Sequence, residues 1–230
     1  MSANAWKIAG ALAALWWVAD SLDDGAGDCG YQVTQADHDA VEASLFVHPL
    51  DWLLPPVGAC IPSALLGGED AQIPGTAFTW KDASSRSDGP LPYMWRPNAL
   101  ILAENLTRLG QALGKTIKIN SWWRGPKASR SSDQGEFAKR GGWGGYHPSG
   151  GAADIRVSGM SKDTLWRAIQ DLISQGVISD GGLGIYAAVD SVHYDVRGAL
   201  TQAHGGSWAR ARWDRRPDPV TGVIDYSGGL

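Results

Sequence analysis

The middle of the chain carries two hydrophobic patterns of different period. From Pro97 onward, apolar residues recur at helical spacing: Leu100, Ile101, Leu106, Leu109 and Leu113. This pattern predicts an amphipathic helix, and Gly114 follows it as a helix-ending signal. Residues Thr116 to Asn120 then alternate β-branched and polar side chains, which is typical of a half-buried strand. We therefore expect a helix and then a strand that runs directly into the segment Ser121 to Arg124.

A second helix and two more strands are predicted further along the chain. Ser161 is a suitable N-cap for a helix from Lys162 to Gln175, which Gly176 would end. The apolar face of this helix consists of Leu165, Ile169 and Leu172. Leu183 to Tyr186 and Val192 to Val196 have the composition of two short strands joined by a turn. The order of these elements predicts an α+β fold, with a small antiparallel sheet and flanking helices.

The regions between and before these elements are rich in glycine, proline and polar residues. Lys127 to Gly145 is polar and ends in GGWGG, which predicts a long loop of the kind that closes over a functional site. Residues 20–77 are interrupted by several Pro and Gly turn signals. We expect an irregular N-terminal extension there, with one short helix from Gln35 to Leu45.

The start of the chain contains an apolar segment, Ile8 to Ala19, which is preceded by Lys7 and followed by acidic residues. It is shorter than the about 20 residues that span a bilayer. An export signal or a membrane-associating helix fits its length and its leading cation, and a buried N-terminal helix fits equally well. The expected organisation is therefore this segment (1–19), the extension (20–77), a main domain (78–216) and a tail (217–230).

Composition and charge indicate a globular protein without a nucleic-acid partner. The chain has 230 residues, of which 43% are hydrophobic and 19% are charged, as in folded domains. Its formal net charge is -4 and it has no long Lys/Arg run, so nothing favours binding to a phosphate backbone. Cys29 and Cys60 lack the close spacing of a zinc or redox motif. A structural disulfide, which requires an oxidising compartment, and two unpaired thiols are both consistent with the sequence.

The residues that carry chemistry lie in two short segments. The first is HPSGGAAD, from His147 to Asp154, and the second is VHYDVRG, which contains His193. Two imidazoles and one carboxylate are the ligand set of a catalytic zinc, which keeps its fourth position open. Between the first two ligands, small residues from Gly150 to Ala153 are expected to let the backbone turn tightly, so that both ligands face one ion.

These segments resemble the zinc D-alanyl-D-alanine carboxypeptidases and endopeptidases that cut peptidoglycan stem peptides. This family has the Hedgehog/DD-peptidase fold and includes many phage endolysins. Its pattern is a strand ending in Ser-x-x-Arg, then His-x-x-Gly-x-Ala-x-Asp, a Gly-Gly-rich strand and a His-x-Asp strand. The chain matches these elements in order, at Ser121 to Arg124, His147 to Asp154, Gly181 to Tyr186 and His193 to Asp195. The resemblance runs from about Phe78 to Trp213.

The resemblance implies a role for each matched residue. The zinc ligands would be His147, Asp154 and His193. Arg124 would bind the carboxylate of the substrate or stabilise the oxyanion that develops at the attacked carbonyl. A general base is also needed.

Two carboxylates are candidates for this base. Asp190 stands three residues before His193, where well-studied members of the family place an acid, and is the candidate that we favour. Asp195 could serve instead, or could orient the imidazole of His193.

Some features of the chain depart from the family pattern or remain open. The loop between Arg124 and His147 is longer than in the family, and Gly145 stands where relatives commonly have Ser. Four aromatic residues near the site could line a substrate groove or pack in the core. They are Trp122, Trp123, Trp143 and Tyr146.

The function implied by the resemblance is zinc-dependent hydrolysis of a peptide bond in peptidoglycan stem peptides, next to a D-alanine. The partner would then be peptidoglycan, and the location would be the cell envelope or periplasm, or a virion if a phage encodes the chain. The apolar N-terminal segment would allow association with a membrane or virion. The alternative is a cell-wall-binding or virion structural module that keeps the fold and the zinc without turnover.

Overall fold

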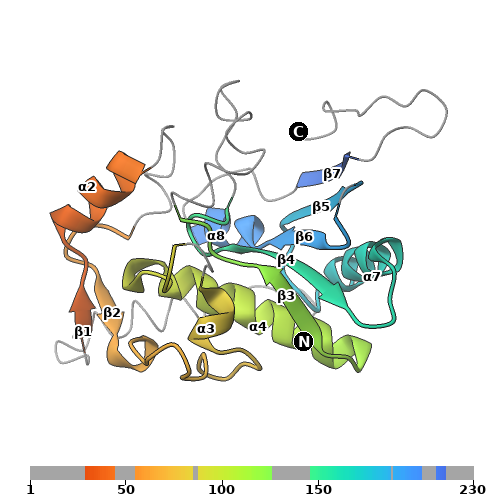
Figure 1. Cartoon of the computed structure of the whole chain (residues 1–230), viewed down its shortest axis with the longest axis horizontal. Coiled ribbons are helices and arrows are strands. Elements are labelled where there is room, and N and C mark those ends of the chain that lie inside the picture. The colour runs from red at the N-terminus through yellow and green to blue at the C-terminus, as the bar shows by residue number, and fades with distance from the viewer. Residues whose placement is uncertain are drawn as a thin grey trace, which may run out of the picture.

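The chain folds into an α+β structure with one five-stranded sheet and one two-stranded sheet (Figure 1). This computed structural model describes residues 29–44, 55–84, 88–125, 146–187, 189–203 and 211–215. The apolar segment Ile8 to Ala19 and the whole loop Lys127 to Gly145, with Trp143, lie outside these residues. Within the described part of the chain, no helix is both long and apolar enough to cross a membrane.

The five-stranded sheet holds the elements that carry the candidate site. Its strand order is β3-β4-β6-β5-β7. The strands are β3 (Ile117–Ser121), β4 (Ala152–Val157), β5 (Gly182–Tyr186), β6 (Val192–Asp195) and β7 (Ala211–Arg215). The first four pair antiparallel, whereas β7 joins the edge of the sheet parallel to β5. The α+β class and the small antiparallel sheet thus agree with the prediction, and β7 is an additional parallel edge strand that the sequence did not predict.

Two helices pack against this sheet, as the hydrophobic periodicity predicts. Helix α4 (Arg96–Leu113) has a proline in its first turn and ends at Gly114, whose φ of 60° is the left-handed conformation that glycine adopts readily. Helix α7 (Lys162–Ser174) begins after Ser161, whose side chain accepts a hydrogen bond from the backbone N–H of Thr164. Helix α4 contacts β3, and α7 contacts β4, β5 and β6.

Shorter helical elements complete the described structure. The α-helices are α2 (Gln35–Ser44), α3 (Trp80–Ala83) and α8 (Arg197–Ala203), and two 3₁₀ turns are η1 (Ser63–Leu65) and η2 (Tyr93–Trp95). Helix α3 begins with a capping box, in which the side chains of Thr79 and Asp82 bond each other's backbone N–H. Predicted helix boundaries agree with the observed ones to within one residue for α2 and α7.

Part of the extension expected to be irregular has regular structure. Strand β1 (Cys29–Gln32) pairs antiparallel with β2 (Cys60–Pro62), and Cys29 and Cys60 form a disulfide. Of the two states that the sequence left open for the cysteines, the structure therefore has the disulfide. Figure 1 shows β1, β2 and α2 together at one end of the molecule, away from β5 and β7. Apolar residues of this region, including Val33 and Ile61, belong to the same hydrophobic core as Trp80.

Removing the disulfide is expected to destabilise the protein measurably. The two cysteines are 31 residues apart, and closing a loop of this length stabilises by about 3–4 kcal/mol in the chain-entropy model. The double variant Cys29→Ala/Cys60→Ala should lower the free energy of unfolding in guanidinium by about this amount. Adding reductant should lower the stability of the unaltered protein, too, and leave the double variant unchanged. Equal stabilities of the two proteins would contradict this expectation.

Candidate metal centre

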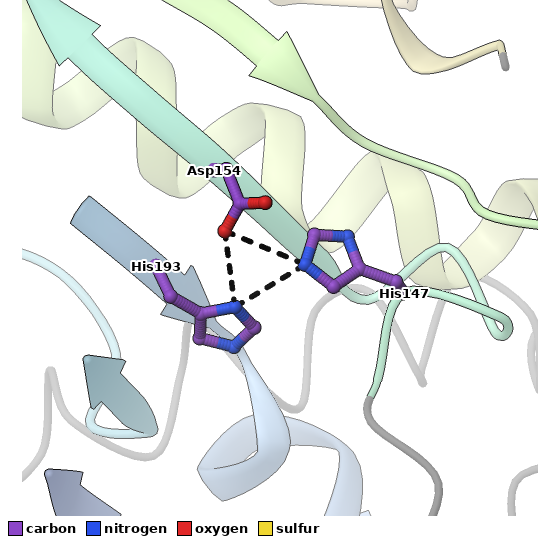
Figure 2. Close-up of side chains that lie close together, drawn as sticks. All are labelled: His147, Asp154 and His193. Atoms are coloured by element: carbon purple, nitrogen blue, oxygen red, sulfur yellow. Dashed lines mark hydrogen bonds and ion pairs between the residues drawn. The ribbon is translucent and has the colours of Figure 1, made fainter. Parts of the chain in front are cut away.

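Three side chains from three separate segments point their ligand atoms at one another (Figure 2). Asp154 lies on β4 and His193 lies on β6, and the antiparallel register makes these two residues direct cross-strand partners. His147 lies in the turn that leads into β4. The candidate atoms are Nε2 of His147, Nδ1 of His193 and Oδ1 of Asp154. The structure thus brings together all three ligands that the sequence predicts.

The triangle formed by these atoms has the size that a zinc ion requires. The two imidazole nitrogens are 3.2 Å apart, and Oδ1 of Asp154 lies 3.4 Å from Nδ1 of His193 and 3.6 Å from Nε2 of His147. In a tetrahedral site with bonds of about 2.0–2.1 Å, two ligand atoms are separated by roughly 3.3–3.4 Å. The three atoms are therefore spaced so that they could hold one ion without rearrangement.

The imidazole of His147 is held in the form that can bind a metal. Its Nδ1 donates a hydrogen bond to the backbone carbonyl of Trp122 at 2.5 Å, which leaves the lone pair of Nε2 facing the cluster. The side chain is 1% exposed, and this burial lowers the pKa of His147. A neutral imidazole is the ligand form, so the protein keeps His147 ready for a metal.

His193 is held by a carboxylate on the side away from the cluster. Its Nε2 donates to Oδ2 of Asp195 at 3.1 Å, while its Nδ1 faces Asp154 and His147. Burial alone would lower the pKa of His193, but the hydrogen bonds with Asp154 and Asp195 outweigh burial and raise it. A metal must therefore displace a proton from this imidazole, and its affinity is expected to increase with pH.

The carboxylate of Asp154 divides its two oxygens between the cluster and a cation. Oδ1 faces the two imidazoles, and Oδ2 accepts a hydrogen bond from the guanidinium of Arg124. Burial opposes ionisation, but the nearby imidazoles outweigh it and hold the pKa of Asp154 well below its usual range. Asp154 is therefore ionised at neutral pH, as a metal ligand must be.

Arg124 lies beside the cluster, but its observed partners differ from the predicted one. Its Nε donates to Oγ of Ser121 at 2.9 Å, and its guanidinium also bonds Asp154. The structure therefore places Arg124 where it orients the carboxylate of Asp154. Binding of a substrate carboxylate or an oxyanion by Arg124 stays a prediction.

The two candidate bases have very different surroundings. Asp195 is fully buried, and its oxygens accept hydrogen bonds from the backbone of Gly182, from His193 and from Arg197. Burial opposes ionisation, but Arg197 and His193 hold the pKa of Asp195 well below its usual range. Asp195 is thus placed to orient His193. Asp190 is exposed, in the turn between β5 and β6.

The turn that presents His147 is shaped by glycine and braced by two tryptophans. Gly150 has a φ of 75°, in the left-handed region. The indole N–H of Trp122 donates to the carbonyl of Gly150 at 2.8 Å, and that of Trp123 donates to the carbonyl of Pro148 at 3.1 Å. Both indoles are buried, so the core-packing interpretation of these two aromatics is confirmed. Tyr146 is buried as well.

The four small residues between His147 and Asp154 divide between the turn and the strand. β4 begins at Ala152, so both alanines are in the strand. Their small side chains are fully buried in the core. The turn itself ends with Gly151, whose backbone N–H donates to the carbonyl of Tyr146 at 3.1 Å.

Close packing around Asp195 leads to a prediction about Gly181. A Cβ at Gly181 would overlap the backbone carbonyl oxygen of Asp195, which cannot move without shifting β6. Gly181→Ala is therefore expected to lower the free energy of unfolding by about 3 kcal/mol. Gly68→Ala is a suitable control, since a Cβ there meets nothing within 4 Å. Chemical denaturation of both variants checks the expectation, and equal stabilities would contradict it.

Comparison of the chain with protein-family models, with curated proteins and with solved structures found no match. The candidate centre is therefore defined by its own geometry. This geometry supports a site for one divalent ion in a buried His/Asp/His cluster.

Proposed function

We propose that the protein is a zinc-dependent peptidase that hydrolyses a peptide bond in peptidoglycan stem peptides, next to a D-alanine. The observation that supports it most is the triangle of His147, Asp154 and His193, in which each ligand is oriented by a second partner. Such outer contacts are the mark of a built metal site rather than of a chance cluster. The substrate class rests on the resemblance of the four sequence elements to the peptidoglycan peptidases.

Zinc is the metal that suits this donor set. Two imidazoles and one carboxylate are a common catalytic zinc set, whereas sites for calcium and magnesium consist of oxygen ligands. When bound, zinc would polarise the carbonyl of the scissile bond and make a water more acidic. The protein residues would hold the ion, place the substrate and move the proton.

We assign the proton transfer to Asp190 rather than to Asp195. The oxygens of Asp195 are occupied by hydrogen bonds from His193, Arg197 and a backbone N–H, so this carboxylate is poorly placed to accept another proton. Asp190 is exposed and precedes His193 by three residues, so a substrate and water can reach it. Arg124 would add positive charge beside the site while it holds Asp154.

Lys162 bonds the backbone of the turn that contains Asp190, which gives a prediction. The ammonium of Lys162 donates to three carbonyls at the end of β5 and in the following turn, those of Tyr186, Ala187 and Val189. Lys162→Met removes all three bonds and is expected to lower kcat by roughly ten- to hundredfold, because a displaced base loses its alignment.

Two further measurements make this prediction specific. Zinc affinity should not change in Lys162→Met, since Lys162 bonds the turn and not the ligands. Lys118→Met, on the exposed side of β3, is the control for loss of a lysine. An unchanged kcat in Lys162→Met would show that these hydrogen bonds are not needed to position Asp190.

One observation favours the alternative, a cell-wall-binding module without turnover. Arg124, the cation expected to meet the substrate, is engaged by Asp154 and Ser121. A protein that uses Arg124 only to hold a ligand could keep the metal as a structural element. The two functions predict different products, so they can be separated directly.

The test is digestion of purified peptidoglycan, with and without a chelator, followed by mass spectrometry of the released fragments. A peptidase should release fragments that show one cleaved peptide bond, and the chelator should abolish their release. Binding to peptidoglycan without any cleaved fragment would favour the alternative. The disulfide between Cys29 and Cys60 supports a location in an oxidising compartment such as the periplasm or cell envelope.

A further inference from the structure

Arg197 makes the most extensive side-chain contacts with the carboxylate that orients His193. It is the first residue of α8, and its side chain is only 19% exposed. Its Nε donates to Oδ1 of Asp195 at 2.9 Å and its Nη2 donates to Oδ2 at 2.7 Å, the two-pronged geometry of a strong arginine–carboxylate pair. Its backbone N–H also donates to Oδ1, at 3.0 Å.

The same guanidinium contacts the segment that carries the other imidazole ligand. Its central carbon lies 4.6 Å from the centre of the Tyr146 ring, within the range of a cation–π contact. Tyr146 directly precedes His147. One cation therefore touches the carboxylate partner of His193 and the chain neighbour of His147.

Backbone hydrogen bonds join the same two segments. The N–H of Val196 donates to the carbonyl of Gly151 at 3.0 Å, and the N–H of Gly151 donates to the carbonyl of Tyr146 at 3.1 Å. These bonds fix how the end of β6 meets the turn that holds His147. Arg197 directly follows Val196. Its side chain therefore lies where the end of β6 is hydrogen-bonded to the turn that holds His147.

We propose that Arg197 is a positioning residue for the metal centre, which sets the two imidazoles relative to each other through Asp195 and Tyr146. This inference rests on the metal site of the proposed function. Oδ1 of Asp195 also accepts from the backbone N–H groups of Gly182 and Arg197, whereas Oδ2 faces His193 and accepts from the guanidinium. Loss of the guanidinium would therefore leave Oδ2 held less firmly toward His193, and would remove the contact on Tyr146. Lysine cannot replace it, because an ammonium lacks the planar fork that bonds both carboxylate oxygens.

The chain offers a matched control for this test. Arg212 is also 19% exposed and also pairs with an aspartate, Asp180, at 2.6 Å. It lies on β7, at the edge of the same sheet. Loss of Arg212 should therefore cost stability as loss of Arg197 does. Arg212 also donates to the carbonyl of Gly181, the peptide group whose N–H bonds Asp195, but its loss leaves both hydrogen bonds between Arg197 and Asp195 in place.

The experiment measures the zinc dissociation constant of the full chain by competition with a chromophoric chelator, for Arg197→Lys, Arg197→Met and Arg212→Met. Thermal unfolding of each metal-free protein is recorded alongside. Both Arg197 variants should bind zinc about 10–100-fold more weakly than the unaltered protein, the usual effect of losing an outer contact. Arg212→Met should keep the original affinity. The absorption spectrum of bound Co²⁺ should change in the Arg197 variants alone.

The outcomes separate this inference from the proposed function. If the unaltered protein binds no zinc, the metal centre and the role of Arg197 both fall. If it binds zinc and the Arg197 variants bind as tightly as Arg212→Met, only the role of Arg197 is overturned. Should Arg197→Met fail to fold, Arg197→Lys decides, since it keeps the charge. Weaker zinc binding in Arg197→Lys than in Arg212→Met, at melting temperatures lowered by similar amounts, supports positioning and not a merely structural role.

Discussion

His147→Ala is expected to weaken zinc binding by about 10²–10⁴-fold and to remove activity under conditions where the unaltered protein is saturated with zinc. Total binding free energies of about 10–16 kcal/mol are typical of structural zinc sites, and one of three protein ligands carries roughly a third or a quarter of that. His147 supplies Nε2 to the cluster. Among the described residues, the cluster contains only Asp154 and His193 besides His147, so no other side chain replaces the lost nitrogen. Isothermal titration of metal-free protein with zinc measures the effect.

His38→Ala is the matched control for this substitution. In the unaltered protein, Nε2 of His38 bonds the backbone carbonyl of Pro55 at 2.8 Å. In the same way, Nδ1 of His147 bonds the backbone carbonyl of Trp122. Both variants lose an imidazole and its hydrogen bond to a backbone carbonyl, but only His147→Ala loses a candidate ligand. Zinc affinity should therefore stay unchanged in His38→Ala. Equal zinc affinities of the two variants would contradict the ligand assignment.

Asp190→Asn is expected to lower kcat by roughly 10²–10⁴-fold, the usual contribution of a positioned general base. The amide keeps the size of the side chain and removes its ability to accept a proton. Zinc affinity should remain that of the unaltered protein, because Asp190 lies outside the ligand cluster. Steady-state hydrolysis of a stem-peptide substrate, at saturating zinc, measures kcat.

Asp195→Asn should have a different signature, which makes it the informative comparison. An amide at this position cannot accept all the hydrogen bonds that Gly182, His193 and Arg197 donate to Asp195, so zinc affinity should fall together with activity. The base assignment would be wrong if Asp190→Asn kept full activity while Asp195→Asn lost activity without losing zinc.

Local sequence patterns predicted the helices, because the spacing of apolar residues and the cap residues lie within or next to each helix. The spacing of apolar residues located α4 and α7, and the cap residues Ser161 and Gly114 located their ends. The resemblance of HPSGGAAD and VHYDVRG to the family pattern predicted all three members of the cluster, because the pattern specifies which histidines and which aspartate share one ion.

The remaining features depend on contacts between distant segments. Strand β7 pairs parallel with β5, although β6 and α8 lie between them in the sequence. Strand β1 pairs with β2, although α2 lies between them in the sequence. The carbonyl of Trp122, which holds His147, has no signature because a backbone atom is the same in every residue. Arg197 stood in the HYDVRG segment, but only the structure shows that it contacts both Asp195 and Tyr146.

The most direct test of the metal centre is zinc titration of the metal-free protein combined with X-ray absorption spectroscopy of the product. We expect one zinc per chain, bound by two imidazole nitrogens and by carboxylate or solvent oxygens at about 2.0–2.1 Å, with no sulfur ligand. This stoichiometry should be lost in His147→Ala and Asp154→Ala. A protein that takes up no zinc, or that binds it equally well without either residue, would contradict the assignment.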